Sequence, residues 1–230
     1  MKQIPLAIGP EQQPTFESYL SQANAETVAQ LRALGPGAPP AYLWGPSGSG
    51  KSHLLRALAD ERRSAGGRAV LFDAGDAVPW ELHEQATLVM VDHCDALDAQ
   101  RQHGAFKLFV EAAAIDAQWV AAGRVPPVDL PLRDDLRTRL AWGHVFALHA
   151  PDESDTRAVL RREAERRGIG LGDGVLDYLL SRFERDLKSL MALFDRLDRY
   201  ALSRQRALTV PLIRQMLNDD GLSDDMSAVA

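Results

Sequence analysis

The sequence predicts an α/β domain with a five-stranded parallel sheet, followed by a small domain made only of helices. Short apolar runs alternate with helical patterns between residues 40 and 150, which is typical of a parallel sheet covered on both faces. Beyond Pro151 only helical patterns with capping residues remain. We expect four segments: an extended tail over 1–14, the α/β domain over 15–150, the helical domain over 151–218 and a disordered acidic tail over 219–230.

The composition is ordinary for a globular protein. Of 230 residues, 46% are hydrophobic and 25% charged, which argues against wholesale disorder. The single cysteine, Cys94, excludes an internal disulfide, and no run approaches the ~20 apolar residues of a membrane span. We therefore expect a cytoplasmic protein. The net charge of −6 has the wrong sign for a protein whose main partner is a nucleic acid, so we expect no sequence-specific DNA binding.

The first twenty residues show no helical pattern. Ile4, Leu6 and Ile8 would lie on one side of an extended tail, which is either a disordered start or a segment that inserts into a groove of a partner. Phe16 and Tyr19 are spaced three apart, so they are either core residues or a pair that covers an adenine face. A helical stretch over 25–34 and a cluster of Gly and Pro then precede the first strand.

A glycine-rich loop joins the apolar run that ends at Trp44 to a helical pattern. Gly45, Gly50, Lys51 and Ser52 fill the fixed positions of G-x-x-x-x-G-K-[ST], a motif that cradles the phosphates of a nucleotide. Lys51 should reach the β- and γ-phosphates, and the Ser52 hydroxyl should bind Mg²⁺. We expect the loop and the residue after it to hold the nucleotide: Gly45, Pro46, Ser47, Gly48, Ser49, Gly50, Lys51, Ser52 and His53.

The next strands carry the second nucleotide signal. We expect a helix over 53–65, a strand over 69–73, a brief helix over 82–86 and a strand over 88–92 that ends in Asp92. Because the carboxyl ends of parallel strands line the ligand crevice, Asp92 should face Ser52 and hold Mg²⁺. The alternative is an aspartate that only forms a turn.

The residue after Asp92 bears on hydrolysis. In many nucleotide hydrolases an acid there orients the attacking water, whereas this chain has His93, without obvious support from Cys94 or Asp95. We therefore expect weak or absent ATP hydrolysis by the isolated chain, with Asp95 as the fallback base.

The remaining elements complete the alternation and then the helical domain. The α/β part continues with a helix over 103–116, a strand over 119–122, an arginine-rich helix over 133–140 and a strand over 144–148. Four helices follow, over 156–167, 173–183, 186–204 and 209–218.

The whole pattern resembles the AAA+ ATPases, and within them the Hda family of short relatives of the replication initiator DnaA. The resemblance is carried by five segments: the tail over 3–8, the glycine-rich loop and the residues after it over 45–55, and the segments 138–143, 183–188 and 208–211. It implies a helical lid domain after the nucleotide domain. It also implies an ADP-bound regulator, tethered to the DNA sliding clamp, that stimulates ATP hydrolysis on DnaA and so prevents re-initiation.

The resemblance also assigns roles to single residues. Arg139 would be an arginine finger that acts in trans on a neighbour's nucleotide, although the spacing alone favours a solvated charge. Arg185 would contact the chain's own phosphates from the lid. Gln3, Ile4, Leu6 and Ile8 would bind the beta subunit of the sliding clamp.

Two other functions and one assembly state stay open. The chain could be an autonomous AAA+ ATPase that loads a helicase, or a small-molecule kinase, although the long helical lid argues against the kinase. A homodimer is also possible from the sequence.

Overall fold

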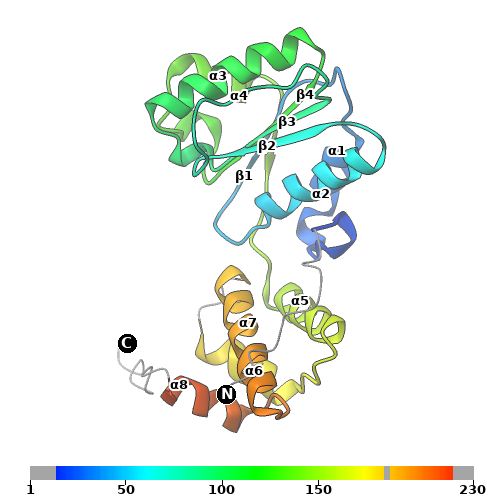
Figure 1. Cartoon of the computed structure of the whole chain (residues 1–230), viewed down its shortest axis with the longest axis vertical. Coiled ribbons are helices and arrows are strands. Elements are labelled where there is room, and N and C mark those ends of the chain that lie inside the picture. Colours follow the sequence, from blue (N-terminus) through cyan, green and yellow to red (C-terminus); the bar gives the residue numbers. More distant parts are fainter. Residues whose placement is uncertain (1–13, 184–186, 220–230) are drawn as a thin grey trace. The chain divides into compact units, whose positions relative to one another are not determined.

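The computed structural model describes residues 14–183 and 187–219. The chain divides into two compact units, of which one ends at Pro151 and the other begins at Asp152. The first unit contains the sheet, and the described residues of the second form helices and their connections (Figure 1). Each unit has its own hydrophobic core.

The sheet has five parallel strands in the order β2-β3-β4-β1-β5. The strands are β1 (Ala41–Trp44), β2 (Ala69–Asp73), β3 (Leu88–Asp92), β4 (Gln118–Gly123) and β5 (His144–Ala147). Every residue of β3 and β4 is buried, as expected for central strands with helices on both faces. The register pairs Asp73 with Asp92, so the last residues of two neighbouring strands lie side by side.

Two pairs of helices cover the two faces of the sheet (Figure 1). Helices α1 (Ala25–Ala33) and α2 (Lys51–Ser64) pack on Leu43, Met90 and their neighbours. Helices α3 (Ala99–Ala114) and α4 (Asp134–Ala141) pack on the opposite face. Four short 3₁₀ helices join these elements: η1 (Phe16–Ser18), η2 (Gln22–Asn24), η3 (Cys94–Ala96) and η4 (Pro127–Asp129).

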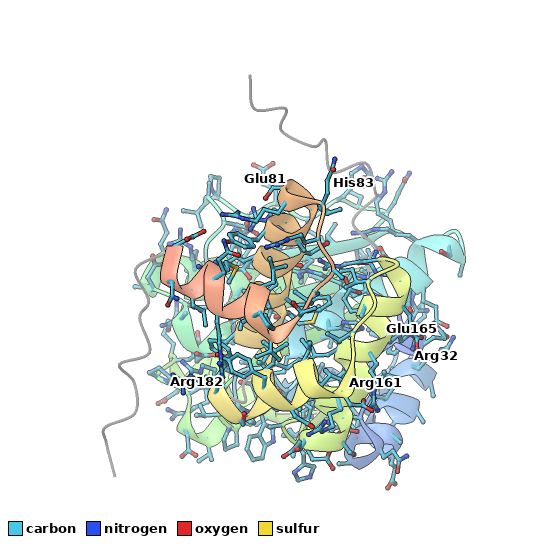
Figure 2. The ribbon with its side chains drawn as sticks, turned by 90° about the horizontal axis from the view of Figure 1, so that it is seen from below. Arg32, Glu81, His83, Arg161, Glu165 and Arg182 are labelled. Carbon is cyan, nitrogen blue, oxygen red and sulfur yellow. The ribbon has the colours of Figure 1, made fainter. Side chains whose placement is uncertain are left out.

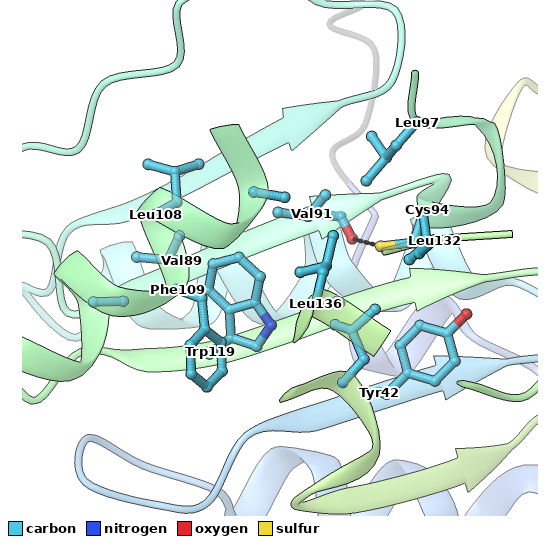
Figure 3. Close-up of a cluster of buried hydrophobic side chains, with 14 of the residues drawn as sticks. Tyr42, Val89, Val91, Cys94, Leu97, Leu108, Phe109, Trp119, Leu132 and Leu136 are labelled. Carbon is cyan, nitrogen blue, oxygen red and sulfur yellow. Dashed lines mark hydrogen bonds between the residues drawn. The ribbon is translucent and has the colours of Figure 1, made fainter. Parts of the chain in front are cut away.

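The core under α3 and α4 contains aromatic rings and the cysteine (Figure 3). Phe109 packs edge-on against Trp119, with 5.3 Å between the ring centroids. The Cys94 thiol donates to the Val91 carbonyl at 3.7 Å, and burial raises its pKa well above the usual range. Because a buried neutral thiol is inert, Cys94 has a structural role.

The second unit contains four helices: α5 (Glu153–Arg166), α6 (Asp173–Arg182), α7 (Leu187–Arg204) and α8 (Val210–Asp219). Asp152 caps α5 by accepting from the Asp155 backbone N–H at 2.7 Å. Leu160, Leu176 and Ile213 are fully buried in its core. The unit therefore has a packed interior of its own.

The predicted fold class is confirmed, but two local predictions were wrong. Residues 82–86 form no helix and belong to an irregular connection that starts after β2 and runs to β3. Helix α3 begins at Ala99, four residues earlier than expected, because Asp98 accepts from the Arg101 backbone N–H at 2.8 Å and caps the helix there. No described helix is both long and apolar enough to span a bilayer.

Candidate functional site

The glycine-rich loop connects the end of β1 to the start of α2. A Cβ at Gly50 would lie 2.3 Å from Cε2 of Tyr19, and the φ of 90° at Gly50 is left-handed. A Cβ at Gly45 would lie 2.3 Å from the Leu148 carbonyl oxygen. Only glycine fits at these two positions, so the loop can pass close to its neighbours and turn into the helix.

Lys51 is a buried cation inside this loop, with 8% of its surface exposed. Its Nζ donates to the carbonyls of Gly45 and Pro46, both at 2.7 Å, and approaches the Ser49 hydroxyl at 3.3 Å. Burial lowers the pKa of Lys51, although the charge of Asp92 opposes this shift. Within the described residues no carboxylate lies within ion-pair distance of Lys51. A buried ammonium held only by neutral oxygens fits an anionic guest, so the residues present suit a phosphate group.

Asn24 is a buried residue that the sequence did not single out, and it supports the glycine-rich loop through Tyr19. The Tyr19 hydroxyl donates to the Ser49 carbonyl at 2.8 Å, and Asn24 Nδ2 donates to Tyr19 Oη at 2.8 Å. Asn24 also donates to the His149 carbonyl and accepts from the His149 backbone N–H, both at 2.9 Å. Nothing in the local sequence indicates this role, because the partners that link Asn24 to the loop and to the end of the unit are 5 and 125 residues away.

The two aromatic residues considered for the adenine base lie in different surroundings. Tyr19 lies against Gly50 of the loop, whereas Phe16 is buried in the core beside α1 and α2 with the Arg32 guanidinium 5.3 Å above its ring. His53 Nε2 lies 2.8 Å from the Thr15 carbonyl and so holds this N-terminal segment against α2. Contact of the base with Phe16, Tyr19 or His53 stays a prediction.

Ser52 and Asp92 are the predicted ligands of Mg²⁺. Ser52 is in the first turn of α2 and half-buried, and Asp92 ends β3 with only 2% exposed. A hydroxyl and a carboxylate beside a phosphate cradle are the oxygen donors that Mg²⁺ prefers, so these residues suit the ion. When bound with a nucleotide, Mg²⁺ would neutralise phosphate charge.

His93 has a carboxylate partner, which is neither Cys94 nor Asp95 but a residue of the neighbouring strand. Its Nδ1 lies 2.7 Å from Oδ2 of Asp73, at the end of the neighbouring strand β2. His93 has a left-handed backbone conformation, with a φ of 52°. The sequence could not place this contact, because 20 residues separate the partners and only the sheet register brings them together. Asp95, expected as the fallback base, accepts from the Arg124 backbone N–H at 2.9 Å.

Helix α4 presents the residue that the resemblance assigns as an arginine finger. Arg133 pairs with Asp135 and Arg137 pairs with Asp134. Arg139 is exposed, and no carboxylate in the described part of the chain pairs with it. It is therefore the α4 arginine that is available to an anion from outside.

Two aromatic rings lie near Arg139, and exposed apolar residues occur at the end of α4 and on the element η4, which contacts α4. Its guanidinium carbon lies 5.5 Å from the Phe109 ring centroid and 6.0 Å from that of Phe106, both on α3. Trp142, three residues further along the chain, has 70% of its surface exposed, and Val128 in η4 has 76%. An exposed tryptophan beside an unpaired arginine is typical of a protein interface.

Five predicted site residues lie outside the described part of the chain. These are the tail residues Gln3, Ile4, Leu6 and Ile8, and the lid residue Arg185. Their roles stay predictions.

The second unit matches a known protein family, and the whole chain is similar to solved structures. The family described as "Hda, lid domain" matches residues 152–217, which cover α5, α6, α7 and α8 except for the last two residues of α8. Domain III of the Thermotoga maritima replication initiation protein DnaA shares the fold, with a TM-score of 0.75 at 19% identity over 92% of this chain and 97% of that chain. The second unit therefore matches the Hda lid family, and the chain as a whole has the fold of domain III of DnaA.

Two further relatives extend this result. The AMPPCP-bound structure of DnaA from Aquifex aeolicus is similar to this chain with a TM-score of 0.65 at 19% identity, over 84% of this chain and 66% of that one. An uncharacterised protein of Haemophilus influenzae is 29% identical over 228 residues, which cover 94% of this chain and 99% of the relative. The predicted fold class and relationship are confirmed.

Proposed function

We propose that this AAA+ protein, which is related to DnaA through its fold and to Hda through its lid, regulates the initiation of chromosome replication. In this proposal it holds ADP and Mg²⁺ in its own loop and presents Arg139 to ATP bound by DnaA. The observation that carries the proposal concerns the arginines of α4 and its N-cap. Arg133 and Arg137 are paired, whereas Arg139 is exposed and has no carboxylate partner among the described residues.

The chemistry of such a contact follows from charge. Negative charge develops on the leaving phosphate oxygens as the γ-phosphoryl group departs, and a guanidinium brought in from a second protein neutralises it. A finger of this kind increases the rate by roughly 10³ to 10⁵. The chain's own nucleotide would be held by Lys51, Ser52 and Asp92, and it would stabilise the form of the protein that binds DnaA.

The tail residues 3–8 complete the proposal by binding the DNA sliding clamp. A clamp loaded on DNA would raise the local concentration of this protein where replication is under way. This part is supported only by the sequence of the tail, with Gln3, Ile4, Leu6 and Ile8 as the contact residues.

The test is the hydrolysis of ATP on DnaA, measured with and without DNA-loaded clamp. We expect the wild-type protein to stimulate hydrolysis in a clamp-dependent manner and to release ADP when denatured. The Arg139→Ala variant should lose the stimulation while it still binds nucleotide and clamp. Arg137→Ala is the matched control, because Arg137 lies on the same helix but is paired with Asp134. Full stimulation by Arg139→Ala would refute the proposal.

A second function, autonomous ATP hydrolysis as in a helicase loader, is favoured by one contact. Asp73 holds Nδ1 of His93 and so orients a ring that follows the magnesium aspartate. This function requires a substantial basal ATPase in the absence of DnaA, which falls when His93 is changed. We expect instead a low basal rate, and a high rate without any effect on DnaA would favour the second function.

A further inference from the structure

Three side chains at the ends of β2 and β3 face one another: Asp73, Asp92 and His93. Their ligand atoms all lie within 4.8 Å of one another. Asp73 and Asp92 are register partners at the strand ends, and the left-handed backbone at His93 lets its ring return toward Asp73. We propose that these three residues bind a divalent transition-metal ion, such as Zn²⁺ or Mn²⁺.

The spacing of the three ligand atoms suits such an ion. Nδ1 of His93 lies 2.7 Å from Oδ2 of Asp73 and 3.7 Å from Oδ2 of Asp92. Metal bonds of 2.0–2.2 Å at tetrahedral or octahedral angles require ligand atoms about 2.8 to 3.6 Å apart. Both distances from Nδ1 lie within about 0.1 Å of this range, and the two carboxylate oxygens lie within 4.8 Å of each other. A movement of at most about 1.2 Å between the carboxylates is therefore enough to place all three atoms on one ion.

The other carboxylate oxygens are already held by backbone N–H groups. Oδ1 of Asp73 accepts from Gly75 at 2.9 Å, and Oδ1 of Asp92 accepts from the N–H of His93 at 2.8 Å. These contacts fix each carboxylate and leave both Oδ2 atoms facing the imidazole, which is the arrangement of outer contacts that orients metal ligands. Asp92 is 98% buried, and among the described contacts its Oδ2 has no hydrogen-bond donor. A cation at this place would neutralise the charge of a carboxylate that is almost fully buried.

The donor set selects the class of metal. Two carboxylates and one imidazole suit Zn²⁺, Mn²⁺ and similar ions, whereas Mg²⁺ prefers oxygen ligands and retains several waters. Cys94 would favour Zn²⁺ more strongly, but its thiol is buried against the Val91 carbonyl and does not face the site. Asp73 and His93 are 40% and 46% exposed, so an ion can enter and complete its coordination with water.

The site differs from the one predicted for Mg²⁺ and is independent of the proposed action on DnaA. The Mg²⁺ site combines Asp92 with Ser52 and requires a nucleotide, whereas the transition-metal site needs no nucleotide. Because the two sites share Asp92, occupation of one changes the carboxylate available to the other. Nucleotide affinity is measured in parallel on the same proteins. Loss of Zn²⁺ binding with unchanged nucleotide affinity concerns the transition-metal site, whereas loss of nucleotide affinity concerns the nucleotide site.

The test is Zn²⁺ binding to the untagged full chain without nucleotide, measured in competition with a chromogenic chelator, with Mn²⁺ followed by electron paramagnetic resonance. We expect one ion per chain, and an affinity at least about tenfold lower in His93→Asn and in Asp73→Asn, since even outer contacts are worth roughly 10- to 100-fold. His83→Asn is the matched control, because His83 is exposed and contacts Arg68 rather than a carboxylate (Figure 2).

Equal affinity in all four proteins, or an equal loss in His83→Asn, would show an adventitious ion only. X-ray absorption on the Zn²⁺-loaded wild-type protein gives a readout that does not depend on how the variants fold. We expect one nitrogen and two carboxylate oxygens around the metal, and a sulfur ligand or an all-oxygen shell would overturn the assignment.

Discussion

The chain holds two cations in opposite ways, Lys51 in the glycine-rich loop and Arg139 on α4. Lys51 is buried and bound by backbone carbonyls, so its position is fixed before any ligand arrives. Arg139 is exposed and lies over aromatic rings, which hold a guanidinium weakly and leave its N–H donors free of carboxylates in the described residues. The first arrangement suits a ligand kept by the chain itself, and the second suits a ligand that a partner brings.

The largest effect is expected from Lys51→Ala, which removes the buried cation and should weaken nucleotide binding. Hydrogen bonds to a charged group are worth about 1.5–3 kcal/mol each, so the loss of its phosphate contacts should weaken ADP and ATP binding by roughly 100-fold. Equilibrium titration with a fluorescent nucleotide measures this. Lys107→Ala is the control, because Lys107 is exposed on α3 and pairs with Glu111 at 3.4 Å. Unchanged nucleotide affinity in Lys51→Ala would show that Lys51 does not hold a ligand of the chain itself, and the contrast with Arg139 would be lost.

A smaller effect on the same region is expected from Tyr19→Phe. The change removes the hydroxyl that donates to the Ser49 carbonyl but keeps the ring against Gly50. The loss of a neutral hydrogen bond of about 1 kcal/mol should reduce nucleotide affinity roughly fivefold. The same titration applies, with Tyr200→Phe in the helical unit as control. If both variants bind nucleotide as the wild type does, the contact does not support the phosphate loop.

The smallest effect is expected from Phe106→Leu, which should reduce the stimulation of DnaA by Arg139. The change removes one of the two rings beneath Arg139, and a cation–π contact at an exposed site is worth about 0.5–1 kcal/mol. Stimulation of DnaA should fall by roughly two- to fivefold in the maximal rate, while nucleotide affinity is unchanged. Arg133→Ala is the control, because it removes the other cation over Phe106 and leaves the ring. An equal loss in that control would mean that the effect is not specific to Arg139.

The sequence predicts the sheet and the place of the glycine-rich loop between a strand and a helix well, because both depend on local patterns. The residues over 69–73 and 88–92 are apolar runs that become strands with these bounds, and the loop motif has fixed spacing. The brief helix expected over 82–86 does not form, because Trp80 and Ala86 of that connection are buried in the core without a regular backbone. Tertiary packing decides such a segment, and no local signal reports it.

The parts of the site that the sequence could not predict all depend on pairings across long separations. Asp73 meets His93 only because the register places the ends of β2 and β3 together. Asn24 reaches His149 across 125 residues, and an asparagine in a polar stretch gives no sign of burial. The environment of Arg139 depends likewise on how α3 packs on α4, so the spacing on α4 alone favoured a solvated charge.

Hydrogen bonds through Asn24 connect the glycine-rich loop to the end of the α/β unit. The Ser49 carbonyl is bound by Tyr19, Tyr19 by Asn24, and Asn24 by both backbone groups of His149, two positions before Pro151. Since Asn24 is fully enclosed, none of these side chains can swing away into water without a large cost. Exchange of the proposed nucleotide must therefore either leave Ser49 in place or displace the backbone at the end of the α/β unit.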